Sequence, residues 1–230
     1  MALKKYLGEK HFNFMSHRVH PKIFRIKEIS DWLSRGFYKE KPAKYLEEDF
    51  KIREFLEKKL KECSVATIEI ERFSNRINVI INTGRPGLVI GRGGAGAEEI
   101  KKSLEKVISL KDQKAKVPEI RVDIRGVREV WSNPDLVIEW IAQRIEKRMP
   151  FRKVLKQAIS KIMLVKGVEG ARIEIAGRLG GAEIARREWL KKGNLPRQTI
   201  RADIIYGSGT ANCSYGAIGI KVWIYKGEKF

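Results

Sequence analysis

A cluster of glycines near the middle of the chain constrains the fold more than any other segment. Four glycines fall within the six residues Gly91–Gly96, after the apolar run Leu88–Ile90 and before a helical pattern from Ala97 to about Ser109. Glycine adopts positive φ angles at little cost and lets a backbone or a phosphate come close. This segment therefore predicts a tight turn at the start of a helix, with backbone amides that attract anions.

The glycine spacing fits a dinucleotide-binding loop, a nucleic-acid-binding Gly-x-x-Gly loop, or a plain turn that binds no ligand. Gly91, Gly93 and Gly96 have the spacing of a dinucleotide-binding fingerprint, which requires a buried strand before it. Pro86 and Gly87 leave only three apolar residues there, too few for such a strand. No Gly-Lys-Ser/Thr follows, which argues against a P-loop. The alternatives are a plain glycine-rich turn and a Gly-x-x-Gly loop between two helices.

The order of the surrounding elements favours the Gly-x-x-Gly loop. We expect a helix over residues 47–62, strands Thr67–Arg72 and Arg76–Thr83, a helix broken at the glycines, and strand Ile120–Ile124. This order resembles the type II, prokaryotic form of the K-homology (KH) domain, whose loop clamps about four nucleotides. We therefore expect a type II KH domain over residues 47–126. Its RNA-binding loop would consist of Gly91, Arg92, Gly93 and Gly94.

The rest of the chain predicts a second domain and two connections. Residues 1–46 are expected to form a basic arm with a short helix around Lys27–Ser34, and residues 127–133 a linker. Residues 134–230 begin with two helices, from Pro134 to about Met149 and from Pro150 to about Val165. Strands Ala171–Ala176, Thr199–Tyr206 and Ala217–Tyr225 follow, with a glycine turn and a helix near Ala182–Leu190 between the first two. The predicted fold class is α+β, a KH domain followed by an α/β domain of two helices packed on a small sheet.

The charge of the chain indicates a polyanionic partner. There are 48 Lys and Arg residues against 28 Asp and Glu, a net charge of +20. Such an excess is typical of nucleic-acid binding. An anionic membrane surface is the alternative, but the basic residues lie on both sides of folded segments and not on one amphipathic tail. No run of eighteen apolar residues could span a membrane. The two cysteines, Cys63 and Cys213, are too few for a disulfide scaffold or a cysteine zinc site and fit a reducing, cytosolic setting.

The helix that begins at Pro150 has one apolar and one basic side. Arg152, Lys153 and Lys156 lie together opposite the apolar stripe at 100° per residue. Arg152 and Lys156 are four residues apart, where like charges repel. A face that tolerates this repulsion is more typical of a phosphate-binding surface than of a solvated helix, although the solvated face stays the alternative.

A second basic segment, Gly177–Trp189, combines a glycine turn with paired arginines. Arg178, Gly180 and Gly181 are expected beside the N-terminus of the following helix, and Arg186 and Arg187 on that helix, all as RNA-binding residues. Trp189 is expected in the core, with stacking on a base as the alternative.

Catalytic chemistry is not apparent in the sequence. His11, His17 and His20 cluster in the basic arm without cysteine or carboxylate companions at metal-ligand spacing, and no nucleophile elbow occurs. We expect no enzyme, cofactor or metal. The rival hypothesis is an RNA-processing or dinucleotide-dependent enzyme that uses the glycine loop.

Several motifs together resemble one family. They are Val19–Pro21, Arg85–Gly91, Gly177–Trp189, Arg201–Ile204, Tyr215–Gly216 and Lys221–Glu228. From about Val19 to Glu228 the chain is similar to the bacterial S-three family of small-subunit ribosomal proteins. Relative to that family's pattern, residues 1–14 are additional and the loop Lys111–Val117 is longer.

The resemblance implies a function. It implies a cytoplasmic protein in the head of the small subunit that binds 16S ribosomal RNA, lines the messenger RNA entrance and contacts the small-subunit proteins S-ten and S-fourteen. By the same resemblance, Arg152, Lys153 and Lys156 correspond to basic residues that face incoming messenger RNA and help to open its secondary structure.

Overall fold

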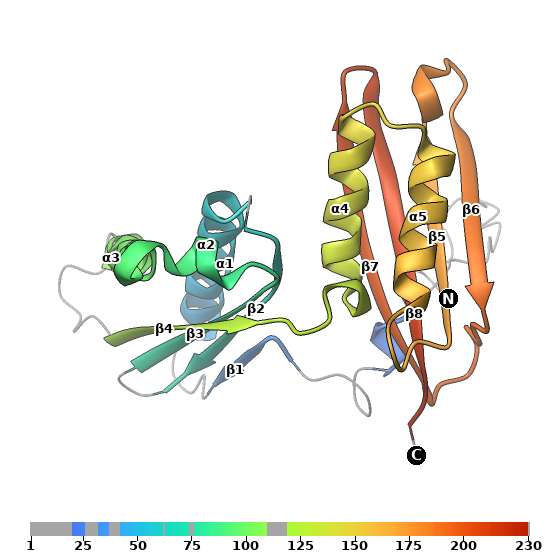
Figure 1. Ribbon diagram of the computed structural model, residues 1–230. Coiled ribbons are helices and arrows are strands. Elements are labelled where there is room, and N and C mark those ends of the chain that lie inside the picture. The colour runs from blue at the N-terminus through green and yellow to red at the C-terminus, as the bar shows by residue number, and fades with distance from the viewer. Residues whose placement is uncertain are drawn as a thin grey trace, which may run out of the picture.

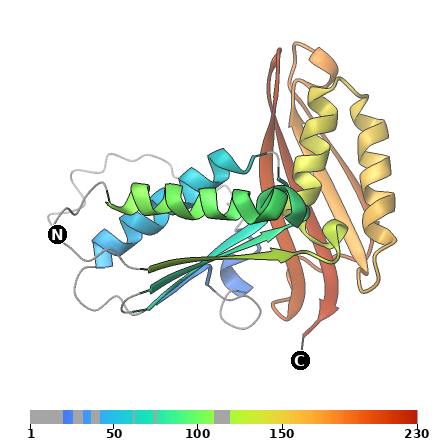
Figure 2. The same ribbon diagram turned by 60° about the vertical axis from the view of Figure 1, so that its left-hand side comes forward.

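The computed structural model describes residues 20–25, 32–36, 42–61, 63–73, 76–109 and 119–229. These residues form two halves, each a four-stranded sheet with helices on one face (Figure 1; Figure 2). Residues 1–14 of the expected arm with His11, His17 after them, residues 27–31 of the expected short helix and the loop 111–117 lie outside the described residues.

The first half contains the expected order of elements and one strand that was not expected. Its elements are β1 (Ser34–Gly36), which was not expected, α1 (Pro42–Lys59), β2 (Val65–Arg72), β3 (Arg76–Thr83), α2 (Pro86–Ile90), α3 (Ala95–Ser109) and β4 (Glu119–Gly126). The strands lie in the order β1-β2-β3-β4, with β2 and β3 antiparallel and β4 parallel to β3. The expected helix near residues 27–34 is wrong at its end, because Ser34 pairs with Ile70 in β1.

Alternating strands and two amphipathic helices build the core of the first half. Ile70 and Ile81 of the sheet pack with Leu56 of α1 and with Ile100 and Leu104 of α3. Each such side chain contributes about 1.5–3 kcal/mol by leaving water. The sheet and its helices thereby hold α2, and the glycines after it, at one end of the half.

The second half is an antiparallel sheet with two helices on one face. It consists of α4 (Pro134–Glu146), α5 (Phe151–Met163), β5 (Gly170–Gly177), β6 (Arg186–Gly193), β7 (Ala202–Cys213) and β8 (Gly216–Glu228), with the strand order β6-β5-β8-β7. Asn133 caps α4 by accepting a hydrogen bond from the Asp135 amide at 3.0 Å, and Pro134 occupies the first turn. The expected linker 127–133 contains a short helical turn, Val130–Ser132.

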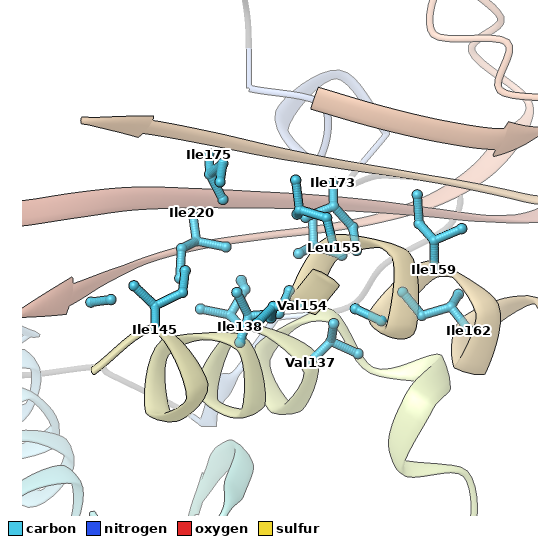
Figure 3. Close-up of a cluster of buried hydrophobic side chains, with 14 of the residues drawn as sticks. Val137, Ile138, Ile145, Val154, Leu155, Ile159, Ile162, Ile173, Ile175 and Ile220 are labelled. Carbon is cyan, nitrogen blue, oxygen red and sulfur yellow. The ribbon is translucent and has the colours of Figure 1, made fainter. Parts of the chain in front are cut away.

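Apolar residues at helical spacing on α4 and α5 meet alternate residues of the sheet. Figure 3 shows Leu155 of α5 beside Ile173 of β5, and Val154 of α5 beside Ile138 of α4. All of these side chains are buried. This packing directs the opposite side of α5 towards solvent.

The helix expected near Ala182–Leu190 is wrong. Residues 182–185 are irregular, and Arg186–Gly193 form β6 at the edge of the sheet, where Gly177 pairs with Arg186. Alanine, glutamate and arginine favour a helix locally, but strand pairing with β5 overrides that preference. Trp189, expected in the core, is therefore on an edge strand and is exposed.

Parts of the expected basic arm, residues 1–46, contact different halves of the molecule. Arg25 is buried and donates hydrogen bonds to the carbonyl oxygens of Arg197 at 3.1 Å and Thr199 at 2.9 Å. β1, by contrast, pairs with β2 of the first sheet. The domain limits 47–126 and 134–230 stay a prediction.

Candidate nucleic-acid interface

The glycine loop, Gly91–Gly94, connects α2 with α3 through residues in the left-handed region. The φ angles are 70° at Gly91, 60° at Gly93 and 84° at Gly94. Residues with a Cβ adopt this region at a cost of about 1–2 kcal/mol each. The path of the loop therefore depends on these glycines.

The glycines of this segment have two separate uses. A Cβ at Gly96 would lie 2.6 Å from the carbonyl oxygen of Val89, and a Cβ at Gly91 would lie 2.9 Å from the amide nitrogen of Gly96. This outer pair permits the close approach of α2 and α3. Around Gly93 and Gly94 a Cβ would meet no atom within 4 Å. The inner pair therefore leaves the backbone open, with exposed Arg92 next to it.

The loop geometry suits a polyanion better than a dinucleotide. Leu88–Ile90 belong to α2 and not to the buried strand that the dinucleotide fingerprint requires. The amides of Gly94 and Ala95 donate to the carbonyl oxygens of Gly91 and Arg92, so the N-terminus of α3 and exposed Arg92 are the features that attract phosphate. Glu98 in the first turn of α3 opposes that attraction. The loop thus has the Gly-x-x-Gly geometry, and Glu98 reduces its electrostatic attraction for phosphate.

The basic face of α5, defined by Arg152, Lys153 and Lys156, is exposed as expected. Arg152 is additionally bound to Glu188 of β6, with Nη2 3.0 Å from Oε1 and Nε 3.3 Å from Oε2. This hydrogen-bonded pair raises the pKa of Arg152 and lowers the pKa of Glu188. Lys153 and Lys156 have no ion-pair partner within the described ranges. The two lysines therefore carry the uncompensated charge of this face.

Packing of α4 against α5 adds two cations that sequence reasoning missed. Arg144 and Lys161 line a shallow depression of about 440 Å³ together with Lys156. Arg144 lies 4.4 Å from the centre of the Trp140 ring, and Lys161 lies 4.7 and 4.9 Å from the rings of Trp131 and Trp140. Cation–π contacts hold both side chains at the edge of the depression. The basic content of residues 144–161 was a signal, but their meeting depends on helix packing.

The segment 178–185, which we call the β5–β6 loop, is a hairpin connection. Gly180 and Gly181 have φ angles of 68° and 84°, as the turn requires. The guanidinium of Arg178 donates to the carbonyl oxygens of Ala182 at 3.0 Å and Tyr215 at 3.3 Å. The expected position of Arg178 beside a helix N-terminus is wrong, because no helix follows the turn. Its guanidinium instead connects the β5–β6 loop to the backbone of Tyr215.

The paired arginines that follow point to opposite faces of the sheet. Arg186 lines a hollow of about 260 Å³ with Arg152 and Phe151 of α5 and with Glu188. Arg187 instead forms an ion pair with Glu174 on the other face. The structure thus brings Arg186 and the β5–β6 loop next to the α5 basic face. The glycine loop belongs to the other half of the molecule (Figure 1).

Other candidate chemistry is limited. His20 is exposed, and its ring packs edgewise on Tyr206 with the centres 4.7 Å apart. Burial, together with the charge of Lys22, lowers the pKa of His20. Across the described residues, His, Cys, Asp and Glu form no group of three that could hold a metal, and no helix is long and apolar enough to span a membrane.

Comparison with known proteins identifies the family to which the chain belongs. A family model for the KH domain matches residues 51–132, and the model "Ribosomal protein S3, C-terminal domain" matches residues 141–224. The protein named small ribosomal subunit protein uS3 of Caldicellulosiruptor saccharolyticus is 48% identical over 215 residues, which are 93% of this chain and 93% of that protein. The chain belongs to the uS3 family. The uS3 protein of Desulfitobacterium hafniense is 44% identical over 214 residues, 93% of this chain and 94% of its own length.

Membership of the uS3 family agrees with the geometry. The KH match covers the glycine loop, and the C-terminal match covers the α5 basic face and the β5–β6 loop. The predicted fold class, a KH domain followed by two helices on a sheet, is confirmed.

Proposed function

We propose that this chain is a structural, RNA-binding component of the small ribosomal subunit, acting in the cytoplasm and not as an enzyme. One observation carries the proposal: the α5 basic face and Arg186, distant in sequence, form one exposed basic region. Membership of the uS3 family and the net charge of +20 support it. Such regions bind the phosphates of RNA.

Within that function we assign two kinds of RNA contact. The β5–β6 loop, with Gly180, Gly181 and Arg186, is proposed to bind 16S ribosomal RNA in the head of the subunit. Arg178, held by Tyr215, would support that surface, whereas Arg187, which the sequence also indicated, pairs with Glu174 on the other face of the sheet and would contact RNA only there. The glycine loop, Gly91–Gly94, is proposed to take single-stranded RNA. The small-subunit proteins S-ten and S-fourteen are proposed as neighbours.

The α5 basic face is proposed to line the messenger RNA entrance. Opening a messenger hairpin requires the energy of its base pairs. A fixed group of cations can supply part of it by binding the phosphates of the emerging single strand. Lys153 and Lys156 would bind phosphate directly, whereas Arg152 is paired with Glu188 and would add a phosphate contact only where that pair is broken.

Ribosomes that carry Arg152→Ala, Lys153→Ala and Lys156→Ala test this assignment. The buried side of α5 is untouched, so the subunit should assemble and translate unstructured messages normally. Messages with a stable hairpin downstream should be translated more slowly. A matched control replaces Lys58, Lys61 and Lys106, exposed lysines of the first half, and removes the same charge. Failed assembly, or equal slowing of both messages, would assign this face to ribosomal RNA instead.

A further inference from the structure

The face of the second sheet opposite α4 and α5, here called the outer sheet face, carries a row of stacked groups. Tyr206 of β7 lies 5.2 Å from Trp223 of β8, measured between ring centres. The guanidinium carbon of Arg172 on β5 lies 5.6 Å from the Trp223 ring centre and 4.4 Å from that of Trp189 on β6. Strand register places Arg172 beside Trp223, and Trp223 beside Tyr206. The row therefore crosses all four strands.

The two ends of this row differ in exposure. Trp223 is buried among Leu195, Ile204 and Tyr206, whereas Trp189 at the other end is 55% exposed. Tryptophan is normally well buried in folded proteins. One face of the Trp189 indole lies against Arg172, so its exposed surface is the opposite face and the ring edge. This exposed indole face is accessible to a ligand.

The guanidinium of Arg172, which packs against Trp189, is fixed by contacts within the protein. Glu174, only 3% exposed, accepts a hydrogen bond from Nη2 of Arg172 at 2.9 Å and pairs with Arg187. Burial opposes the charged carboxylate, but the hydrogen bonds from the two arginines outweigh it and lower the pKa of Glu174. Nε of Arg172 is buried and has no hydrogen-bond partner in the described part of the chain. Stacking therefore positions Arg172 at the cost of one unmade hydrogen bond.

The charge of the outer sheet face indicates the chemistry of the ligand. In register, Lys191 lies opposite Arg172, Lys221 lies opposite Glu174, and Arg187 lies opposite Ala176. The part of this face around Trp189 thus carries four cations, Arg172, Arg187, Lys191 and Lys221, together with the carboxylate of Glu174. A protein partner would have to supply matching acidic groups, whereas RNA offers phosphates and flat bases together. Aromatic side chains on an open sheet, flanked by cations, bind unpaired bases by stacking.

We propose that Trp189 is a stacking platform for an unpaired RNA base, with Lys191 and Lys221 beside it for the adjoining phosphates. The site is separate from the α5 basic face, because Glu188, the residue before Trp189, points to the helix side and binds Arg152. The inference rests on the proposed RNA-binding function and assigns to it a second surface. β6, at the edge of the sheet in Figure 1, would then contribute to both.

The test compares variants of the full chain in binding a single-stranded oligouridine of twelve nucleotides. Trp189→Ala should weaken binding roughly five- to a hundredfold without changing the salt dependence, because stacking involves no counterion release. Trp189→Phe should lose less, since it keeps an aromatic face. Lys191→Ala should lower the salt slope by about one. Phe50→Ala, which removes an exposed aromatic ring from α1, is the matched control and should bind as the wild type does.

Stacking also has a spectroscopic signature. RNA should quench tryptophan fluorescence in the wild type, and Trp189→Phe should lose most of that quenching. Wild-type affinity for Trp189→Ala, or unchanged quenching in Trp189→Phe, would overturn the platform. So would normal RNA binding by Trp189→Ala combined with failure to enter the small subunit, which would point to a protein partner. A wild-type chain that binds no RNA would instead refute the proposed function.

Discussion

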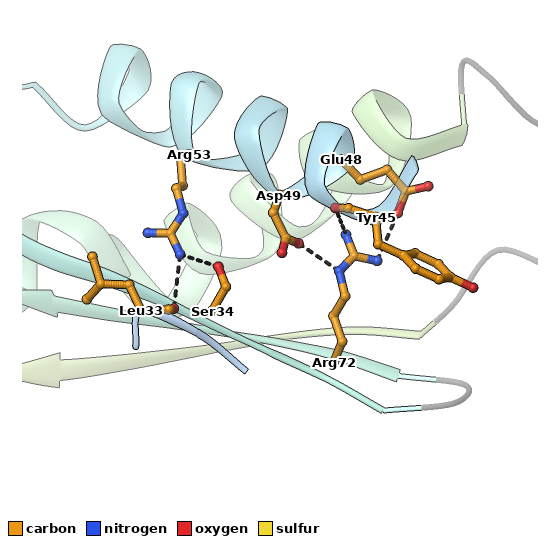
Figure 4. A network of polar contacts seen from close by, with 7 residues as sticks. All are labelled: Leu33, Ser34, Tyr45, Glu48, Asp49, Arg53 and Arg72. Atoms are coloured by element: carbon orange, nitrogen blue, oxygen red, sulfur yellow. Dashed lines mark hydrogen bonds and ion pairs between the residues drawn. The ribbon is translucent and has the colours of Figure 1, made fainter. Parts of the chain in front are cut away.

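Arg72 in the first half and Arg152 in the second both bind glutamate, yet the side chain of Arg72 is 8% exposed and that of Arg152 is 73% exposed. Figure 4 shows Arg72 at the end of β2 between Glu48 and Asp49 of α1, at 2.8 and 2.7 Å. Arg53 of α1 reaches Ser34 and the carbonyl oxygen of Leu33 in the same way. These arginines join α1 to the sheet and are not available to RNA.

The comparison shows that a basic composition does not locate an interface. In the first half, the candidate RNA contact is the backbone at Gly93 and Gly94 with one exposed cation, Arg92, while Arg53 and Arg72 bind within the protein. In the second half, cations on α5 and β6 are at the surface, and the backbone of the sheet is paired. The two halves should therefore respond differently to substitution, salt and charge reversal.

The largest difference is expected in stability. Arg72→Ala would remove two largely buried ion pairs, with Glu48 and with Asp49, which should lower the free energy of unfolding by about 3–5 kcal/mol. Arg152→Ala breaks an ion pair of the same kind in an exposed position and should leave the unfolding midpoint unchanged. Urea unfolding followed by circular dichroism measures both. Equal destabilisation would show that the exposed pair is as important to folding as the buried one.

The next difference concerns charge at the glycine loop. Replacing Arg92 and Gly93 by Asp should weaken binding of single-stranded RNA by the full chain about tenfold or more, because unit charges about 4 Å apart interact by about 1–4 kcal/mol near a surface. Arg92→Asn with Gly93→Asn is the matched control, since Asn has the shape of Asp without its negative charge.

Filter binding or fluorescence anisotropy gives these affinities, and circular dichroism checks the fold. The fold should survive, because a side chain at residue 93 meets no neighbour within 4 Å and the positive φ at this one position costs about 1–2 kcal/mol, equally in the aspartate and amide variants. Equal binding by the aspartate and amide variants would mean that the loop is only a helix turn.

Much of the fold could be predicted because its signals are local. β3 occupies the predicted residues Arg76–Thr83, and α5 and its exposed face follow from the spacing of apolar residues on one helix. β6 could not be predicted in this way, because its residues favour a helix and only pairing with β5 makes them a strand. Local propensity is reliable where tertiary pairing does not oppose it.

The site was less predictable because its contacts connect distant residues. Arg152 meets Glu188 across 36 positions in the sequence, and Arg178 meets Tyr215 across 37. The sequence identifies these residues as basic, but it does not distinguish a cation that binds the protein from one that is free for RNA. Arg144 and Lys161 converge only because α4 packs against α5.

A smaller effect is expected in the salt dependence of RNA binding. The slope of log affinity against log salt falls by about one for each phosphate contact that is lost. Replacing Arg152, Lys153 and Lys156 by Ala should lower the slope by about two and not three, because Glu188 already neutralises Arg152. Titrations between 50 and 200 mM salt measure it. A loss of about one for Arg152→Ala alone would contradict the neutralisation.

The smallest effect is expected from Glu188→Gln, which releases Arg152 without removing it. The slope should rise by at most about one, and the added change of Arg152→Ala should abolish the rise. Because hydrogen bonding to Arg152 lowers the pKa of Glu188, the pair contributes to folding above the ordinary glutamate value of about 4.3. That contribution is lost only as pH falls through the lowered folded value. Glu188 is therefore ionised throughout the neutral range, and a slope difference measured there reports the released arginine and not a titration. An unchanged slope in Glu188→Gln would mean that Arg152 does not reach phosphate even when it is free, and would leave Lys153 and Lys156 as the RNA-binding residues of α5.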